Sequence, residues 1–194
     1  MRCGVIALQV RENHTTQPQS SIFLQLAKQY GLRKEYGKAL GYASMSRRVS
    51  QESRFSRQRL YTIDIVTAGI YNDMGQYKKA LDLLDSIFAI QGENPLSPDV
   101  KIDALYQKAR ALSLSGKDRQ ALADCTAAIH TAHSSHLHFR DMGLPRLMAE
   151  INWDLGDYER SRWLDRQIME MNTRDTTDHA GYWVGGMTKQ AEKC

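Results

Sequence analysis

The sequence IDIVTAGIYNDMGQYKKALDLLDSIFAI, residues 63–90, predicts two amphipathic helices joined by a tight turn at Gly75. Small or apolar residues stand where the two helices would touch, among them Ala68 and Ala80. Glycine accepts the positive φ angle that ends a helix without steric cost, and alanine lets two helix backbones approach closely. This stretch therefore predicts a helical hairpin.

Three other parts of the chain repeat the hairpin pattern. The turn positions are 41, 41 and 40 residues apart and hold Lys34, Gly75, Gly116 and Gly156. An alanine stands seven residues before each turn, at Ala27, Ala68, Ala109 and Ala149. One helix pair cannot bury its apolar stripe alone, so a fixed period in this range is typical of stacked helix pairs. We therefore expect a solenoid.

The repeat pattern divides the chain into segments. Residues 1–20 have no sustained period, so we expect a loose lead-in with Ser20 or Ser21 as a helix cap. Ser97-Pro98-Asp99 has the order of a helix start, with a cap, a proline and an acid. A helical repeat domain is expected over residues 21–194. Its units are expected at about 21–50, 57–91, 98–133 and 138–172, followed by a terminal helix at 177–193.

Composition limits the class of protein. The chain has 194 residues, of which 42% are hydrophobic, and only four prolines, which favours a helical globular domain. No apolar run approaches the roughly 20 residues of a membrane span. Three widely spaced cysteines indicate reduced thiols, and the opening segment MRCGVIALQV lacks the pattern of a signal peptide, which predicts a cytoplasmic location. The formal charge of +4 comes from alternating acids and bases, which permits a nucleic-acid partner without indicating one.

The turn regions carry the motif A-x2-Y-x3-G-x-Y-x2-A, present as Ala68, Tyr71, Gly75, Tyr77 and Ala80. In this motif the chain resembles the tetratricopeptide repeat (TPR) family, over about residues 21–172. The resemblance implies an all-α solenoid, a right-handed superhelix of about four TPR-like helix pairs plus a C-terminal helix. The period is longer than the family's usual 34 residues, and an early position that is apolar in the family holds Phe23, Asp64, Leu105 and Pro145. Long repeats of this kind are similar to those of bacterial regulatory and sensor proteins.

The resemblance also implies a partner-binding surface, because first helices line the concave face of TPR stacks. Positions that usually point inward hold Gln25, Lys28, Asn72, Asp73, Tyr106, Arg110, Arg146, Glu150 and Trp153. Lys28 and Arg110 could clamp a carboxylate, and Asn72 could hold a peptide backbone. Tyr106 and Trp153 are either interface anchors or packing residues between helices.

Other clusters have competing explanations. His130, His133 and His136, with His138 and Cys125 nearby, are candidate zinc or nickel ligands, although a polar loop beside a core cysteine explains them as well. Five arginines between residues 47 and 59 could contact phosphate, but solvated helix ends explain them more simply. Enzyme motifs are absent, so we expect no enzyme and no cofactor.

These observations predict a TPR-like scaffold that binds a protein or peptide, as a regulatory or sensor segment of a bacterial signalling or transcription-control protein. The alternative is a ligand- or metal-gated regulator that uses the loop between His130 and His138. Nucleic acid is disfavoured because the inward positions differ from unit to unit. The oligomeric state stays open, a homodimer included. The tail around Gly185 and Gly186 lacks the polar outer face of a terminal cap, which favours a fragment of a larger protein.

Overall fold

The computed structural model describes residues 16–52, 57–89, 95–135, 137 and 143–173. These residues form helices and short connections, and contain no strand. The eight helices found in this part of the chain are α1 (Thr16–Leu32), α2 (Tyr36–Glu52), α3 (Arg57–Asp73), α4 (Tyr77–Ala89), α5 (Pro98–Leu114), α6 (Asp118–Ser134), α7 (Gly143–Asp154) and α8 (Tyr158–Thr173).

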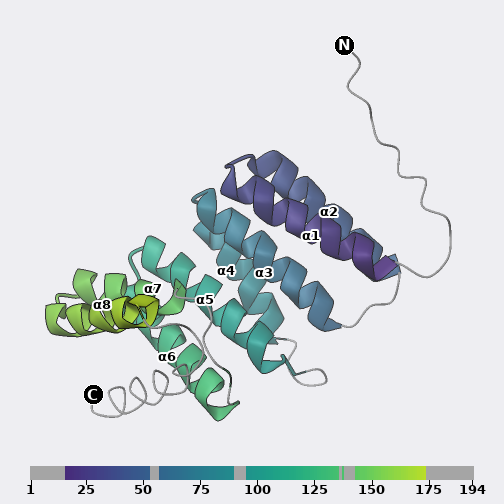
Figure 1. The fold of residues 1–194 in the computed structure, drawn as a ribbon. Helices are drawn as coiled ribbons and strands as arrows, with labels where there is room; N and C mark the ends of the chain where they lie inside the picture. Colours follow the sequence, from purple (N-terminus) through teal and green to yellow (C-terminus); the bar gives the residue numbers. More distant parts are fainter. Residues whose placement is uncertain (1–15, 53–56, 90–94, 136, 138–142, 174–194) are drawn as a thin grey trace.

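Consecutive helices form four antiparallel pairs that stack side by side (Figure 1). Each pair contacts the next, and the first helices also contact one another in the order α1, α3, α5, α7. This arrangement is an α-solenoid, so the predicted all-α stack of four helix pairs is confirmed. The predicted terminal helix at 177–193 lies outside the described residues.

The four turns share one backbone conformation. Within the described residues, positive φ angles occur only at the predicted turn positions, at 60° in Lys34, 72° in Gly75, 74° in Gly116 and 83° in Gly156. In every turn the N–H of the following residue donates to the carbonyl five residues earlier, at 2.8–2.9 Å: Glu35 to Tyr30, Gln76 to Tyr71, Lys117 to Leu112 and Asp157 to Asn152. This bond satisfies a carbonyl that the helix end would otherwise leave free.

Small residues occupy the crossing point of each pair. Ala27, Ala68 and Ala109 are fully buried, and Ala149 is 4% exposed. Five residues after each turn the partner helix presents a second small side chain, at Ala39, Ala80, Ala121 and Ser161, each buried. Two small residues at one crossing allow the close helix contact that a larger side chain would prevent.

Apolar clusters join each pair to the next. One links α1 and α2 to Ile70 of α3, a second links α3 and α4 to Val100 and Ala104 of α5, and a third extends over α5, α6, α7 and Leu164 of α8. No cluster belongs to a single pair, so the pairs stabilise one another, as the repeat pattern predicts.

The beginning of the domain differs from the prediction. Helix α1 begins at Thr16, so the lead-in predicted over residues 1–20 is wrong for its last residues. Ser20 does not cap a helix: it lies inside α1, is fully buried, and its hydroxyl is 3.0 Å from the Ser46 hydroxyl and 2.6 Å from that of Ser50 in α2. The partner hydroxyls satisfy it, which is why a polar residue is stable in this core.

The helix start predicted at Ser97 is confirmed. Ser97 is the N-cap of α5, Pro98 opens the helix and Asp99 lies in the first turn. The Ser97 N–H and hydroxyl both donate to Oε1 of Gln58 in α3, which ties the start of α5 to the preceding pair.

The turn conformation predicts a cost for Gly116→Ala. A Cβ at Gly116 meets nothing within 4 Å, so the substitution causes no steric clash with other residues. Its cost is that of holding alanine at a positive φ angle, and we expect the free energy of unfolding to fall by about 1 to 2 kcal/mol. Gly41→Ala is the matched control, because Gly41 is equally open but lies within α2, where alanine should stabilise by about 0.5 to 1 kcal/mol. Urea unfolding measures both. Equal effects of the two substitutions would contradict the role given to the turn.

Candidate functional site

The helices α1, α3, α5 and α7 form a surface, here called the first-helix face, and carry the nine predicted partner-binding residues. Six of them are exposed: Gln25, Lys28, Asp73, Arg146, Glu150 and Trp153. Trp153 is 54% exposed, and its ring meets that of Tyr158 edge-on with centroids 4.8 Å apart. An exposed aromatic pair beside charged groups is suited to anchoring a partner.

Asn72 is not available to a partner, which corrects the prediction that it holds a peptide backbone. It is 2% exposed, and its side-chain nitrogen donates to the Gln107 carbonyl of α5 at 3.0 Å and to Gln107 Oε1 at 3.3 Å. Gly69, one turn earlier in α3, leaves room for the Gln107 side chain, since a Cβ there would lie 3.2 Å from its oxygen. Asn72 therefore connects two helix pairs.

Arg110 also already has a partner within the protein. Its Nη2 donates to Oδ1 of Asp73 at 2.5 Å, and both side chains are 32% exposed. The predicted carboxylate clamp of Lys28 and Arg110 is therefore wrong, because a carboxylate of α3 already holds the guanidinium. Tyr106 is half-buried and packs against the apolar cluster of α5 to α8, so the packing explanation holds for this residue.

The histidines do not form a metal site in the part of the chain that the structure describes. His130 and His133 are exposed on α6, whereas His136 and His138 lie outside the described residues. Cys125 is fully buried, and burial, with a smaller contribution from Asp124, raises the pKa of its thiol to about 12. Its complete burial makes Cys125 a core residue. No three potential ligands gather anywhere among the described residues.

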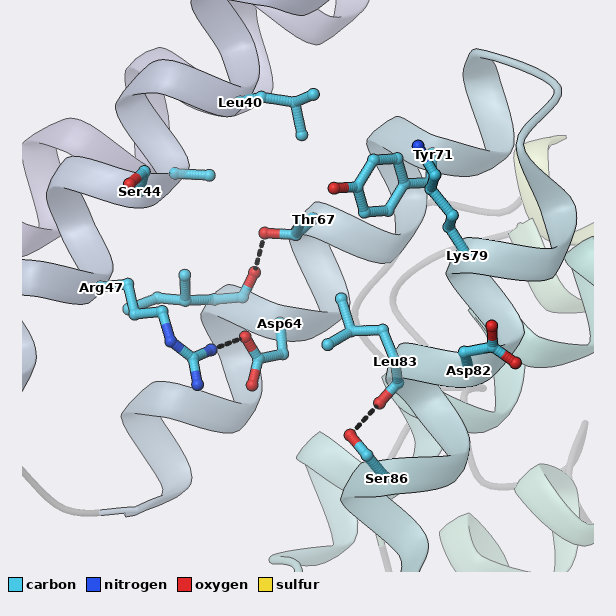
Figure 2. A pocket seen from close by; sticks show the side chains of 12 residues that line it. Leu40, Ser44, Arg47, Asp64, Thr67, Tyr71, Lys79, Asp82, Leu83 and Ser86 are labelled. Carbon is cyan, nitrogen blue, oxygen red and sulfur yellow. Dashed lines mark hydrogen bonds and ion pairs between the residues drawn. The ribbon is translucent and has the colours of Figure 1, made fainter.

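Sequence reasoning missed a groove between the second helices α2 and α4, with α3 as its floor (Figure 2). We call it the junction groove. It is open to the surface and encloses about 580 Å³. None of the nine predicted residues lines it. Its walls are formed by Leu40, Ala43, Ser44, Arg47, Ile63, Asp64, Thr67, Tyr71, Lys79, Asp82, Leu83 and Ser86.

An ion pair crosses the wall of the junction groove. Figure 2 shows Nη1 of Arg47, in α2, on Oδ1 of Asp64, in α3. The Asp64 side chain is 12% exposed and that of Arg47 42% exposed. Burial raises the pKa of Asp64 above its ordinary value, since desolvation outweighs the attraction of Arg47. Two of the five arginines between residues 47 and 59 are therefore not explained by solvated helix ends alone. Arg47 pairs with Asp64, and Arg59 donates to the Ser21 hydroxyl of α1 at 2.5 Å.

The repeat register contains the signal that would have located the groove. Thirteen residues after the turn the second helices hold Arg47, Phe88 and Ile129, and eleven residues before the next turn the first helices hold Asp64, Leu105 and Pro145. Apolar residues thus occupy both positions at the second and third junctions between helix pairs. Only the first junction replaces them with charges, and the groove lies there.

No helix in the described part of the chain is both long and apolar enough to span a bilayer.

Comparison with known proteins identifies the fold. No protein-family model and no curated protein matches the sequence. Among solved structures, the chain is similar to a MamA double mutant, with a TM-score of 0.53, 12% identity, and 84% of this chain and 80% of that chain covered. It is also similar to a TPR-like protein from Chlorobium tepidum, with a TM-score of 0.52, 17% identity, and 77% and 96% covered. The chain therefore has a TPR-like helical-repeat fold.

The difference between the first and second junctions predicts that a double substitution at the first will stabilise the protein. Arg47→Phe with Asp64→Leu installs the residues of the second junction, and we expect the free energy of unfolding to rise by about 1 kcal/mol, the low end for replacing a buried ion pair, since Arg47 is 42% exposed. Asp64→Leu alone should not stabilise, because it leaves Arg47 without its partner. Chemical unfolding at pH 7 measures all variants. A loss of stability in the double variant would refute the register comparison.

The same variant tests the direction of the Asp64 shift. A raised pKa means that the folded state holds the Asp64 proton more tightly than the unfolded state, so this group's contribution to stability falls as pH rises above 3.8. The double variant lacks that decline. Its advantage over the wild type should therefore grow between about pH 4 and pH 7, and an advantage that shrinks over this range would show that the pair stabilises the fold.

Proposed function

We propose that the chain is a TPR-like scaffold that binds a protein or peptide along the first-helix face. The observation that supports the proposal is the continuous contact of α1, α3, α5 and α7, together with exposed predicted residues on α1, α3 and α7. A repeated surface of this kind suits an extended partner, because each unit adds contact area without a new fold.

The chemistry of the exposed residues supports a polar partner with an apolar anchor. Lys28 and Arg146 are exposed and form no ion pair within the described residues, so each is a candidate to contact a carboxylate of the partner. Glu150 supplies an opposite charge one turn from Arg146 on α7. Trp153, with Tyr158 against its edge, provides the large rigid contact area that dominates binding energy at many interfaces.

We also propose the cellular role expected from the sequence, a regulatory or sensor segment of a bacterial signalling or transcription-control protein. The support is the resemblance of the long repeat to segments of such proteins. A role of this kind requires binding without catalysis, which the first-helix face could provide.

The proposal predicts that Trp153→Ala weakens binding to an array of 15-residue peptides by roughly 30-fold, the effect of losing a hot-spot residue worth about 2 kcal/mol. Stability should change by less than about 0.5 kcal/mol, because Trp153 is 54% exposed. Met45→Ala is the matched control, since Met45 is 43% exposed on α2 and lies away from the first-helix face. An array without binders, or equal weakening by both substitutions, would reject the first-helix face as the binding surface.

A further inference from the structure

We propose that the junction groove is a second docking site, and that it takes a bulky apolar side chain, of the size of phenylalanine, from a partner peptide. The inference is independent of the first-helix face, because no residue of that face among the nine predicted ones lines the groove. It follows from what fills the corresponding space at the other junctions.

At the second junction an aromatic ring of the protein occupies the equivalent position. Phe88, in α4, packs on the same apolar cluster as Leu105 of α5, and Lys108 lies over the Phe88 ring at 5.5 Å from its centroid. At the first junction the matching residues are Arg47 and Asp64, whose ion pair lies at the wall and leaves the space beside it open. The first junction thus lacks the apolar pair, Phe88 and Leu105, that packs together at the second.

Two further differences keep the first junction open. Nζ of Lys108 lies 2.7 Å from Oδ1 of Asp85 and so bridges α5 to α4 at the second junction. The matching residues at the first junction are Thr67 and Ser44, which are short and uncharged, and the Thr67 hydroxyl instead donates to the Ile63 carbonyl of its own helix. Ala43 also replaces the larger Leu84. In each case the first junction has the smaller side chain, and Ala43, Ser44 and Thr67 all line the groove.

The lining fits an apolar anchor with a polar surround. Leu40, Ala43, Ile63 and Leu83 give the groove an apolar lining. Figure 2 labels Leu40 and Leu83 on opposite sides of it. A volume of about 580 Å³ lies in the range of ligand sites and exceeds one side chain, so neighbouring residues of the partner also enter. Exposed Lys79 and Asp82 on α4 can contact their polar groups. The occupant is therefore a peptide segment with one phenylalanine-like anchor.

The test uses the full chain with labelled isoleucine, leucine and alanine methyl groups and N-acetyl-L-phenylalanine N-methylamide as the probe. We expect saturable NMR shifts of the Ile63, Leu40 and Leu83 methyls, with a dissociation constant on the order of 1 mM for a ligand of this size. The control probe is N-acetylglycine N-methylamide, which lacks the anchor.

Two variants fill the groove: Arg47→Phe with Asp64→Leu, and Ser44→Phe, which keeps the ion pair. Each should weaken the binding at least tenfold.

The outcomes separate the alternatives. Shifts confined to the groove methyls and lost in both folded filled variants support the docking site. Shifts that persist in either filled variant, that the glycine probe reproduces, or that never appear in the wild type overturn it. If the same methyls shift on raising the protein concentration without any probe, the occupant is a second copy of the chain and the peptide proposal is wrong. None of these outcomes bears on the first-helix face, which the Trp153 substitution tests separately.

Discussion

The fold depends on how each first helix ends. One residue with a positive φ angle, followed by a hydrogen bond from the next N–H to the carbonyl five residues earlier, recurs in all four turns. This closure fixes both the last residue of the first helix and the direction in which the second departs. Small residues at fixed distances from the turn then meet at the crossing, as Ala68 and Ala80 do, and that close approach sets the spacing of the stack.

The part of the structure that repeats could be predicted because the same physical requirement appears four times. Lys34 illustrates this: nothing in its chemistry indicates a left-handed turn, yet its register places it there, and its φ angle is 60°. Ser20 could not be placed, because serine favours helix caps and its burial depends on Ser46 and Ser50, 26 and 30 residues away. Local preference fails where a distant partner satisfies the polar group.

The candidate site was less predictable for a related reason. Position within a repeat indicates which way a side chain points, but not whether the neighbouring unit already binds it. Asn72 and Arg110 stand at repeat positions that usually point inward, but residues of the adjacent pair, Gln107 and Asp73, take up their hydrogen bonds. Residues that differ between units at the same repeat position are more informative. At these positions Arg47 and Asp64 distinguish the first junction from the second and third.

The ion pair at that junction is expected to contribute less stability than apolar residues would. Desolvation raises the pKa of Asp64 despite the nearby guanidinium, so the charged carboxylate is less favourable in the folded state than in water. Removing either partner would leave a charge unpaired, so the two charges depend on each other. Together they line the groove without filling it, whereas Phe88 and Leu105 pack in one apolar cluster at the next junction. The first junction therefore has less apolar packing than the second and exposes a partly apolar surface. Such a local departure from good packing is expected where a protein binds a partner.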